Sequence, residues 1–251
     1  MPADDPIIVE PILPRPAGGR WAPTVGPETL DFLRLIVPEG GRETARDAAI
    51  SILAKAIPPD APFGQETGLV VGYVQSGKTL SYETVAALAR DNGFQIVVVV
   101  AGIANPLLDQ SAGRLRRDLR LDDPGRVRRW IQFQNPGDDD ATVQAIRDVL
   151  DDWRDPGTPE EYKKTVLITV LKNHRRLKNL TELFRSLGLA GVPVLIIDDE
   201  ADQASLNNEV AQGQESTTYR WLMELRQALP IHTYLQYTAT PQAPLLISII
   251  D

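Results

Sequence analysis

Short apolar runs alternate along most of the chain with longer segments of helical periodicity. The runs are rich in β-branched residues and lie at 68–74, 95–101, 127–133, 165–170, 192–198 and 231–239. Strands that are apolar at nearly every position are typical of a parallel sheet, because the helices between consecutive strands cover both of its faces. The pattern therefore predicts an α/β fold with a mostly parallel sheet covered by helices on both faces.

The first 63 residues follow a different pattern. Residues 1–26 are rich in proline and lack periodicity, which predicts an extended lead-in. Helical patterns follow at Pro27–Ile36 and Arg42–Ile57, and two prolines end the second. We therefore expect an arm and a small helical region in this part of the chain, followed by one α/β lobe over residues 64–251.

Composition narrows the classes of protein that fit this pattern. The 251 residues include no cysteine, which excludes a disulfide scaffold, a zinc finger and a thiol nucleophile. No apolar run is long enough to cross a bilayer, and the first residues lack the features of a signal peptide, so we expect a cytoplasmic protein with no membrane partner. Two polar segments, Asn135–Pro159 and Gln203–Thr217, are interpreted as mobile loops.

A glycine-rich motif follows the first apolar run of the lobe. Residues 72–79 have the sequence GYVQSGKT, and a helical pattern follows at Leu80–Arg90. Between a strand and a helix, the N–H groups of such a loop bind phosphates, and the lysine reaches the β- and γ-phosphates. The motif predicts a site for ATP and Mg²⁺, with Thr79 as a metal ligand. A motif for reading adenine is not evident, although Phe63 and Gln65 lie at a plausible distance before the loop. The expected nucleotide-binding residues are Gly72, Gln75, Ser76, Gly77, Lys78 and Thr79.

A second motif is a strand that ends in acids. Residues 194–202 have the sequence VLIIDDEAD, so a buried strand delivers carboxylates to the carboxyl edge of the sheet, where α/β folds bind ligands. We expect Asp199 to hold Mg²⁺ through its water shell and Glu200 to polarise the attacking water as general base. The doubled aspartate leaves Asp198 as the alternative on the metal side, and Asp199 is favoured because Glu200 follows it directly.

The last apolar run ends at YTATP, residues 237–241. Alone, this motif would be interpreted as a strand stopped by proline. Beside the two preceding motifs, the hydroxyl residues Thr238 and Thr240 are candidates for linking a γ-phosphate site to a neighbouring lobe. The expected catalytic residues are therefore Lys78, Asp199, Glu200 and Thr240.

These motifs together resemble a known group of molecular motors. GYVQSGKT, IIDDEAD and YTATP are similar to motifs I, II and III of the DEAD-like superfamily 2 helicases. More narrowly, GLVVGYVQSGKT, VVVAGIANPLLDQSAGRL, LIIDDEADQASLNN and YLQYTATPQAPLL resemble the Z-one domain family of bacterial helicase-like ATPases and endonucleases. The resemblance covers residues 64–251. It implies a RecA-like P-loop NTPase lobe, an ATP hydrolase coupled to DNA, and partner proteins of a restriction or anti-phage defence system.

The same resemblance implies parts that these residues do not supply. A superfamily 2 motor holds ATP between two RecA-like lobes and uses an arginine finger from the second, and we expect no second lobe within the 251 residues. The second lobe or a partner subunit would then supply the finger. Because an arginine finger typically contributes about 10³–10⁵ in rate, we expect this chain alone to hydrolyse ATP slowly or not at all.

Positive charge is gathered in two segments although the net charge is −8. Residues 114–129 hold seven arginines and three aspartates, and residues 163–178 hold six lysines or arginines and no acid. The resemblance places motifs Ia and Ib of the helicase group at Gly102–Arg114 and Thr169–Leu177, and both basic segments start at or overlap these stretches. In that group the two motifs touch the nucleic-acid backbone. A solvated amphipathic helix explains the first segment as well. The candidates for DNA contact are Arg114, Lys172, Arg175 and Arg176.

Two other functions remain open. One is an ATP-dependent switch that recruits a partner protein and never moves along DNA. The other is an ATP-regulated endonuclease with a metal site formed by Glu161, Lys163 and an upstream aspartate, although a solvated charged turn is the better interpretation of these residues. The upstream candidates are Asp151, Asp152 and Asp155.

Overall fold

Six parallel strands form one sheet in the computed structural model, which describes residues 19–72, 77–124, 127, 129–199 and 217–239. The strand order is β1-β6-β5-β2-β4-β3, and every neighbouring pair is parallel. The predicted α/β fold with a parallel sheet is therefore confirmed. The strands are β1 (Gly64–Val71), β2 (Ile96–Ala101), β3 (Trp130–Gln134), β4 (Thr165–Leu171), β5 (Pro193–Asp199) and β6 (Ile231–Thr238).

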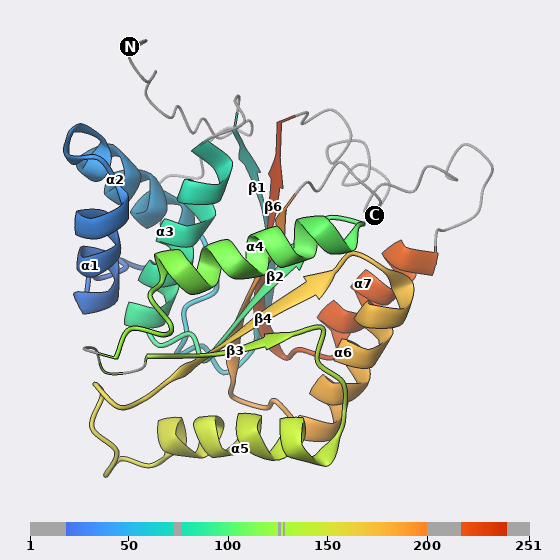
Figure 1. Ribbon diagram of the computed structural model, residues 1–251. Helices are drawn as coiled ribbons and strands as arrows, with labels where there is room; N and C mark the ends of the chain where they lie inside the picture. The colour runs from blue at the N-terminus through green and yellow to red at the C-terminus, as the bar shows by residue number, and fades with distance from the viewer. Residues whose placement is uncertain (1–18, 73–76, 125–126, 128, 200–216, 240–251) are drawn as a thin grey trace.

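Helices cover both faces of this sheet, as Figure 1 shows. The helices α1 to α4 lie on one face and α5 to α7 on the other. Successive side chains of β2 alternate between two cores, with Val97 and Val99 in the first and Val98 in the second, which is why this strand is apolar throughout. The helices are α1 (Pro27–Ile36), α2 (Arg42–Leu53), α3 (Gly77–Asp91), α4 (Asn105–Asp118), α5 (Asp140–Arg154), α6 (His174–Leu187) and α7 (Thr217–Gln227), with a 3₁₀ helix at Glu39–Gly41.

The helix α5 corrects the prediction of a mobile loop over Asn135–Pro159. Its amino end is capped by Asp139, whose side chain accepts the N–H of Thr142 at 3.0 Å. Aspartates on the exposed face of α5 hide its periodicity in the sequence, but its apolar side chains follow helical spacing. The buried ones are Val143, Ile146, Val149 and Leu150. The other predicted loop, Gln203–Thr217, lies outside the described residues except for Thr217, which begins α7.

The helices α1 and α2 pack against α3 and share its core. No side chain at the amino end of α1 caps that helix. Instead, the carboxylate of Asp91, the last residue of α3, accepts the N–H groups of Gly26, Glu28 and Thr29 at 2.8–3.1 Å. A negative charge at this end also suits the helix dipole. The amino-terminal helical region is therefore attached to the helix that follows the glycine-rich motif.

Candidate functional site

The three sequence motifs meet at the carboxyl edge of the sheet. β6 lies between β1 and β5, so the ends of these three strands are neighbours. Val71 pairs with Thr238, and Asp199 pairs with Tyr237. The N–H of Gly72 donates to the carbonyl of Thr238 at 3.0 Å. The fold thus brings three segments that are distant in sequence to one place. Four predicted site residues lie outside the described part of the chain, namely Gln75, Ser76, Glu200 and Thr240.

The glycine-rich motif joins β1 to the amino end of α3. Gly72 follows the strand directly, and Gly77, Lys78 and Thr79 form the first turn of the helix. A Cβ atom at Gly72 would lie 2.7 Å from Cγ of Lys78, so glycine is required where the chain passes the stem of the lysine. The helix directs its free N–H groups and the positive end of its dipole toward this edge, which favours an anion there.

The two aspartates at the end of β5 have different surroundings. Asp198 is fully buried, with its Oδ1 atom 2.5 Å from Nζ of Lys172 and its Oδ2 atom accepting the Tyr234 hydroxyl at 2.5 Å. Asp199 is half-buried at the strand end. Because Asp199 is less buried than Asp198 and lies at the strand end, it is the better placed of the two for a ligand at the edge.

The hydroxyl of Tyr82 is buried beside the motif edge. Burial, and then the negative charge of Asp199, raises the pKa of Tyr82, whereas the side chain of Thr79 opposes this shift. The ring of Tyr82 meets that of Tyr237 edge-on, with 5.9 Å between the ring centres. Burial likewise raises the pKa of Tyr237, so both phenols stay neutral. The negative charge of Asp199 therefore acts on a buried hydroxyl group of α3.

A buried glutamate, Glu83, follows Tyr82 directly on α3 and lies one turn beyond Thr79. Glu83 is 1% exposed, and its Oε1 atom has no hydrogen-bond partner among the described residues. Burial, and then the negative charge of Asp118 on α4, raises the pKa of Glu83 to about 8, whereas the positive charges of Arg114 and Arg117 oppose this shift. Arg114 is half-buried, so this candidate for DNA contact also offsets charge between α3 and α4.

Lys172 does not face solvent, and its prediction as a DNA contact is wrong. The residue is 2% exposed because its side chain points inward from the turn between β4 and α6 to pair with Asp198. Arg175 and Arg176, in the first turn of α6, are exposed. Asn173 caps this helix by accepting the N–H of Arg175 at 3.0 Å. Among the described residues, neither arginine has an ion-pair partner, so both remain candidates for DNA contact.

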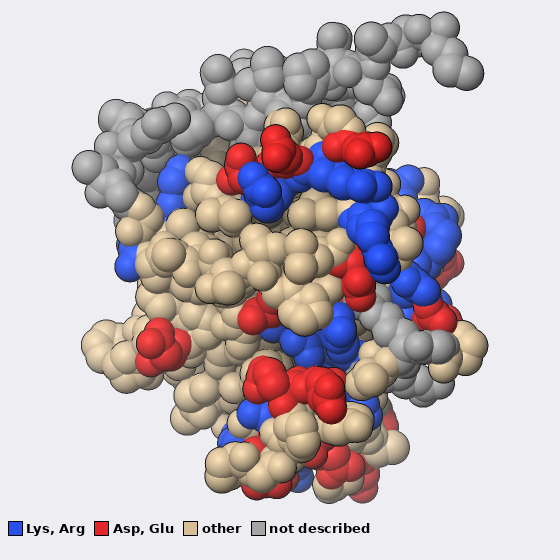
Figure 2. Space-filling view, turned by 90° about the vertical axis from the view of Figure 1, so that its left-hand side faces the viewer, with Lys and Arg blue, Asp and Glu red and all other residues tan. Residues whose placement is uncertain are grey.

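The arginines of segment 114–129 are largely matched by nearby acids. This pairing of arginines with acids favours the interpretation of segment 114–129 as a solvated surface. Basic and acidic side chains are also mixed on the side of the molecule where α1 and α2 face the viewer in Figure 2, in which blue side chains gather along one border with red ones among them. The ion pairs join Arg116 to Asp122, Arg117 to Asp118, Arg120 to Asp123 and Arg129 to Glu28.

Two further sets of candidates lie away from the carboxyl edge. β1 begins at Gly64, so Phe63 and Gln65 lie at the amino end of this strand, at the opposite edge of the sheet from the three motifs. The acids considered for a nuclease precede β4 and lie at the same amino edge, where Lys163 pairs with Glu160 at 3.2 Å. No group of three or more His, Asp or Glu residues that could hold a metal is found in the described ranges.

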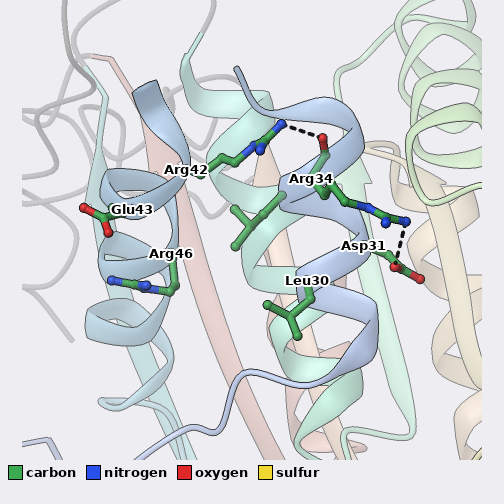
Figure 3. Close-up of a pocket in the computed structure, with 7 residues that line it drawn as sticks. Leu30, Asp31, Arg34, Arg42, Glu43 and Arg46 are labelled. Atoms are coloured by element: carbon green, nitrogen blue, oxygen red, sulfur yellow. Dashed lines mark hydrogen bonds and ion pairs between the residues drawn. The ribbon is translucent and has the colours of Figure 1, made fainter. Parts of the chain in front are cut away.

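A hollow of about 350 Å³ lies between α1 and α2, apart from the motif edge (Figure 3). Leu30 and Leu33 form its apolar part, and arginines from both helices surround them. These arginines bind groups of α1 and α2. Arg34 lies 3.6 Å from Asp31, and Arg42 donates to the carbonyl of Arg34 at 2.7 Å. The hollow thus offers less unpaired positive charge than its composition indicates.

No family model matches this chain, and no curated protein matches it. Within the part of the chain that the structure describes, no helix has the length and apolar character needed to cross a bilayer.

Proposed function

We propose that this chain binds Mg·ATP at the carboxyl edge formed by β1, β6 and β5, and couples hydrolysis to DNA contact as one lobe of a helicase-like or translocase-like motor. The observation that carries the proposal is the strand register, in which Val71 pairs with Thr238 and Asp199 pairs with Tyr237. This register makes the glycine-rich loop, the acidic strand end and the hydroxyl strand end neighbours. The resemblance to the Z-one domain family adds bacterial defence as the biological setting.

The residues at this edge suit a nucleoside triphosphate with Mg²⁺. The chain leaves no room for a Cβ atom between Gly72 and Lys78, and the amino end of α3 favours an anion. The Thr79 hydroxyl and the Asp199 carboxylate are oxygen ligands of the kind that Mg²⁺ takes directly or through water. When bound, ATP supplies a phosphoanhydride bond whose hydrolysis can drive a conformational change.

Each residue has a distinct role in the proposed reaction. The N–H groups of the first turn of α3 hold the β-phosphate, and Lys78 donates hydrogen bonds to the β- and γ-phosphate oxygens. Thr79 and Asp199 hold the metal ion. Glu200 accepts a proton from the attacking water, and Thr240 responds to the state of the γ-phosphate.

We predict that Asp199→Asn weakens the dependence of nucleotide binding on Mg²⁺. The amide removes the negative charge that holds the hydrated metal, and loss of such a partner typically lowers metal affinity by about 10–100-fold. Calorimetric titration of a non-hydrolysable ATP analogue, with and without Mg²⁺, measures the change. Glu161→Gln removes an equal charge at the amino edge and serves as the matched control. Equal Mg²⁺ dependence in both variants would assign the metal to another residue.

Contact with DNA is assigned to the amino end of α6. Arg175 and Arg176 are exposed there and, among the described residues, lack ion-pair partners. Charged side chains that contact phosphates release counterions, so their contribution depends on salt concentration. This combination distinguishes the end of α6 from segment 114–129, where neighbouring acids already neutralise most of the arginines.

We predict that the double reversal Arg175→Glu with Arg176→Glu weakens DNA binding by about 10–100-fold at low salt. Two lost phosphate contacts also flatten the plot of log K against log salt by about 1.4–1.8. Fluorescence anisotropy of labelled single- and double-stranded DNA across several salt concentrations measures both quantities.

The control for this reversal is Arg34→Glu with Arg46→Glu, which changes the net charge equally on the opposite face of the sheet. That variant should bind DNA like the wild type. If both reversals weaken binding equally, the effect is one of overall charge and α6 is not the contact. If the wild type binds no DNA at low salt, the ATP-dependent protein-recruiting switch becomes the favoured function.

A further inference from the structure

Lys172 connects three strands at the carboxyl edge. Its N–H group donates to the carbonyls of Ala101 and Gly102 at 3.1 and 3.3 Å, where β2 ends. Its Nζ atom lies 2.5 Å from Oδ1 of Asp198 and 3.3 Å from the carbonyl oxygen of Asp199, both at the end of β5. Because β2 lies between β4 and β5, the lysine side chain reaches past an intervening strand.

The ion pair between Lys172 and Asp198 is buried completely. Both side chains are 0% exposed, and the Tyr234 hydroxyl on β6 completes the cluster. A buried ion pair is a weak source of stability, because the cost of desolvation offsets the attraction. The ion pair instead fixes the positions of the two segments that carry its partners. Separating the partners would leave a charge buried without compensation, so the turn after β4 and the end of β5 move together.

Lys172 and Asp198 each lie next to a segment that has a role in the proposed function. Asp199 follows Asp198, and Lys172 also donates to the Asp199 carbonyl, so the lysine holds the peptide that carries the proposed metal-side carboxylate. On the other side, Lys172 immediately precedes Asn173, the residue that caps α6. The exposed Arg175 lies in the first turn after this cap. One buried side chain therefore spans the interval between the two proposed binding regions.

We propose that Lys172 is a positioning residue that couples DNA contact at the amino end of α6 to the Mg²⁺ side of the nucleotide site. This inference rests on the proposed function. A phosphate held by Arg175 and Arg176 restrains the turn at Lys172, and the lysine in turn restrains the Asp199 peptide. By linkage, Mg·ATP then changes DNA affinity by the same factor by which DNA changes nucleotide affinity.

The double variant Lys172→Met with Asp198→Asn tests this coupling. It removes both buried charges, leaving neither one uncompensated, and keeps side chains of similar size. The measured quantity is the ratio of Kd for a labelled single-stranded oligonucleotide without and with Mg²⁺ and a non-hydrolysable ATP analogue. We expect a ratio of about 5–20 for the wild type and of about one for the variant. Each ligand alone should bind within about threefold of its wild-type affinity, which a merely structural defect would not preserve.

Two further variants keep the test decisive. Lys178→Met removes an exposed lysine of the same helix and should leave the ratio unchanged. Tyr234→Phe removes only the hydroxyl that holds Asp198, and should lower the ratio in part even if the double variant does not fold. A wild-type ratio in every folded variant of the buried cluster overturns the role of Lys172 and leaves the proposed function standing. A ratio of one in the wild type overturns both.

Discussion

Lys78→Ala is expected to weaken binding of Mg·ATP by at least about 100-fold. In the proposed site the amine of Lys78 donates to oxygens of two phosphates, and a hydrogen bond to a charged group is worth about 1.5–3 kcal/mol. Loss of two such bonds corresponds to about 10²–10⁴ in affinity, since each 1.4 kcal/mol is about tenfold. The helix α3 should remain intact, because alanine is a good helix former.

Titration of a fluorescent ATP analogue in the presence of Mg²⁺ measures this loss. Lys178→Ala provides the matched control, because it removes an exposed lysine of α6 that pairs with Glu182 at 3.6 Å. The control should bind nucleotide like the wild type. Wild-type affinity in a well-folded Lys78→Ala variant would contradict the assignment of residues 72–79 as a phosphate-binding loop.

Glu83→Gln is expected to stabilise the protein at pH 8 by about 2–4 kcal/mol more than at pH 5. The ordinary pKa of this carboxyl is 4.5, and burial raises it to about 8 in the folded protein. Between these values the unfolded chain releases the proton of Glu83 while the folded chain retains it. The free energy of unfolding of the wild type therefore falls as pH rises, by up to about 1.4 kcal/mol per unit for this group. Glutamine, which does not titrate, removes that penalty.

Urea unfolding curves at pH 5, 6.5 and 8 compare the wild type with this variant. Glu182→Gln makes the same substitution at a half-buried glutamate of α6 that pairs with Lys178, and serves as the matched control. A constant difference between wild type and Glu83→Gln across the three values would mean that Glu83 ionises normally in the folded protein.

The strands and the meeting of the motifs were predictable because both follow from local patterns. Continuous apolar runs require a sheet that is buried on both sides, and parallel strands place their carboxyl ends at one edge. The predicted and observed bounds of α1 agree, because Pro27 starts the helix and apolar spacing continues to Ile36. The same reasoning failed for α5, where exposed aspartates outweighed four buried apolar side chains in the composition of the segment.

The role of Lys172 could not be read from its sequence neighbours. It belongs to a segment with six basic residues and no acid, which indicates a charged surface. Its partner, Asp198, lies on another strand, and no pattern within either segment specifies that pairing. Composition gives the charge of a segment, whereas the direction of each side chain is decided by tertiary packing. The same reason explains why Glu83 gave no signal as a buried acid.

The contacts of Asp91 with the amino end of α1 attach that helix to α3. The helix α3 has 15 residues and a length of about 22 Å, with the proposed nucleotide site at one end and the cap of α1 at the other. A polypeptide starting at Gly64 would lose α1 and α2, which pack against α3 and share its hydrophobic core, and would expose part of that core to water. The change of sequence pattern near residue 64 therefore does not separate two hydrophobic cores. The amino-terminal helices therefore support, by hydrophobic packing, the helix whose first turn forms part of the proposed nucleotide site.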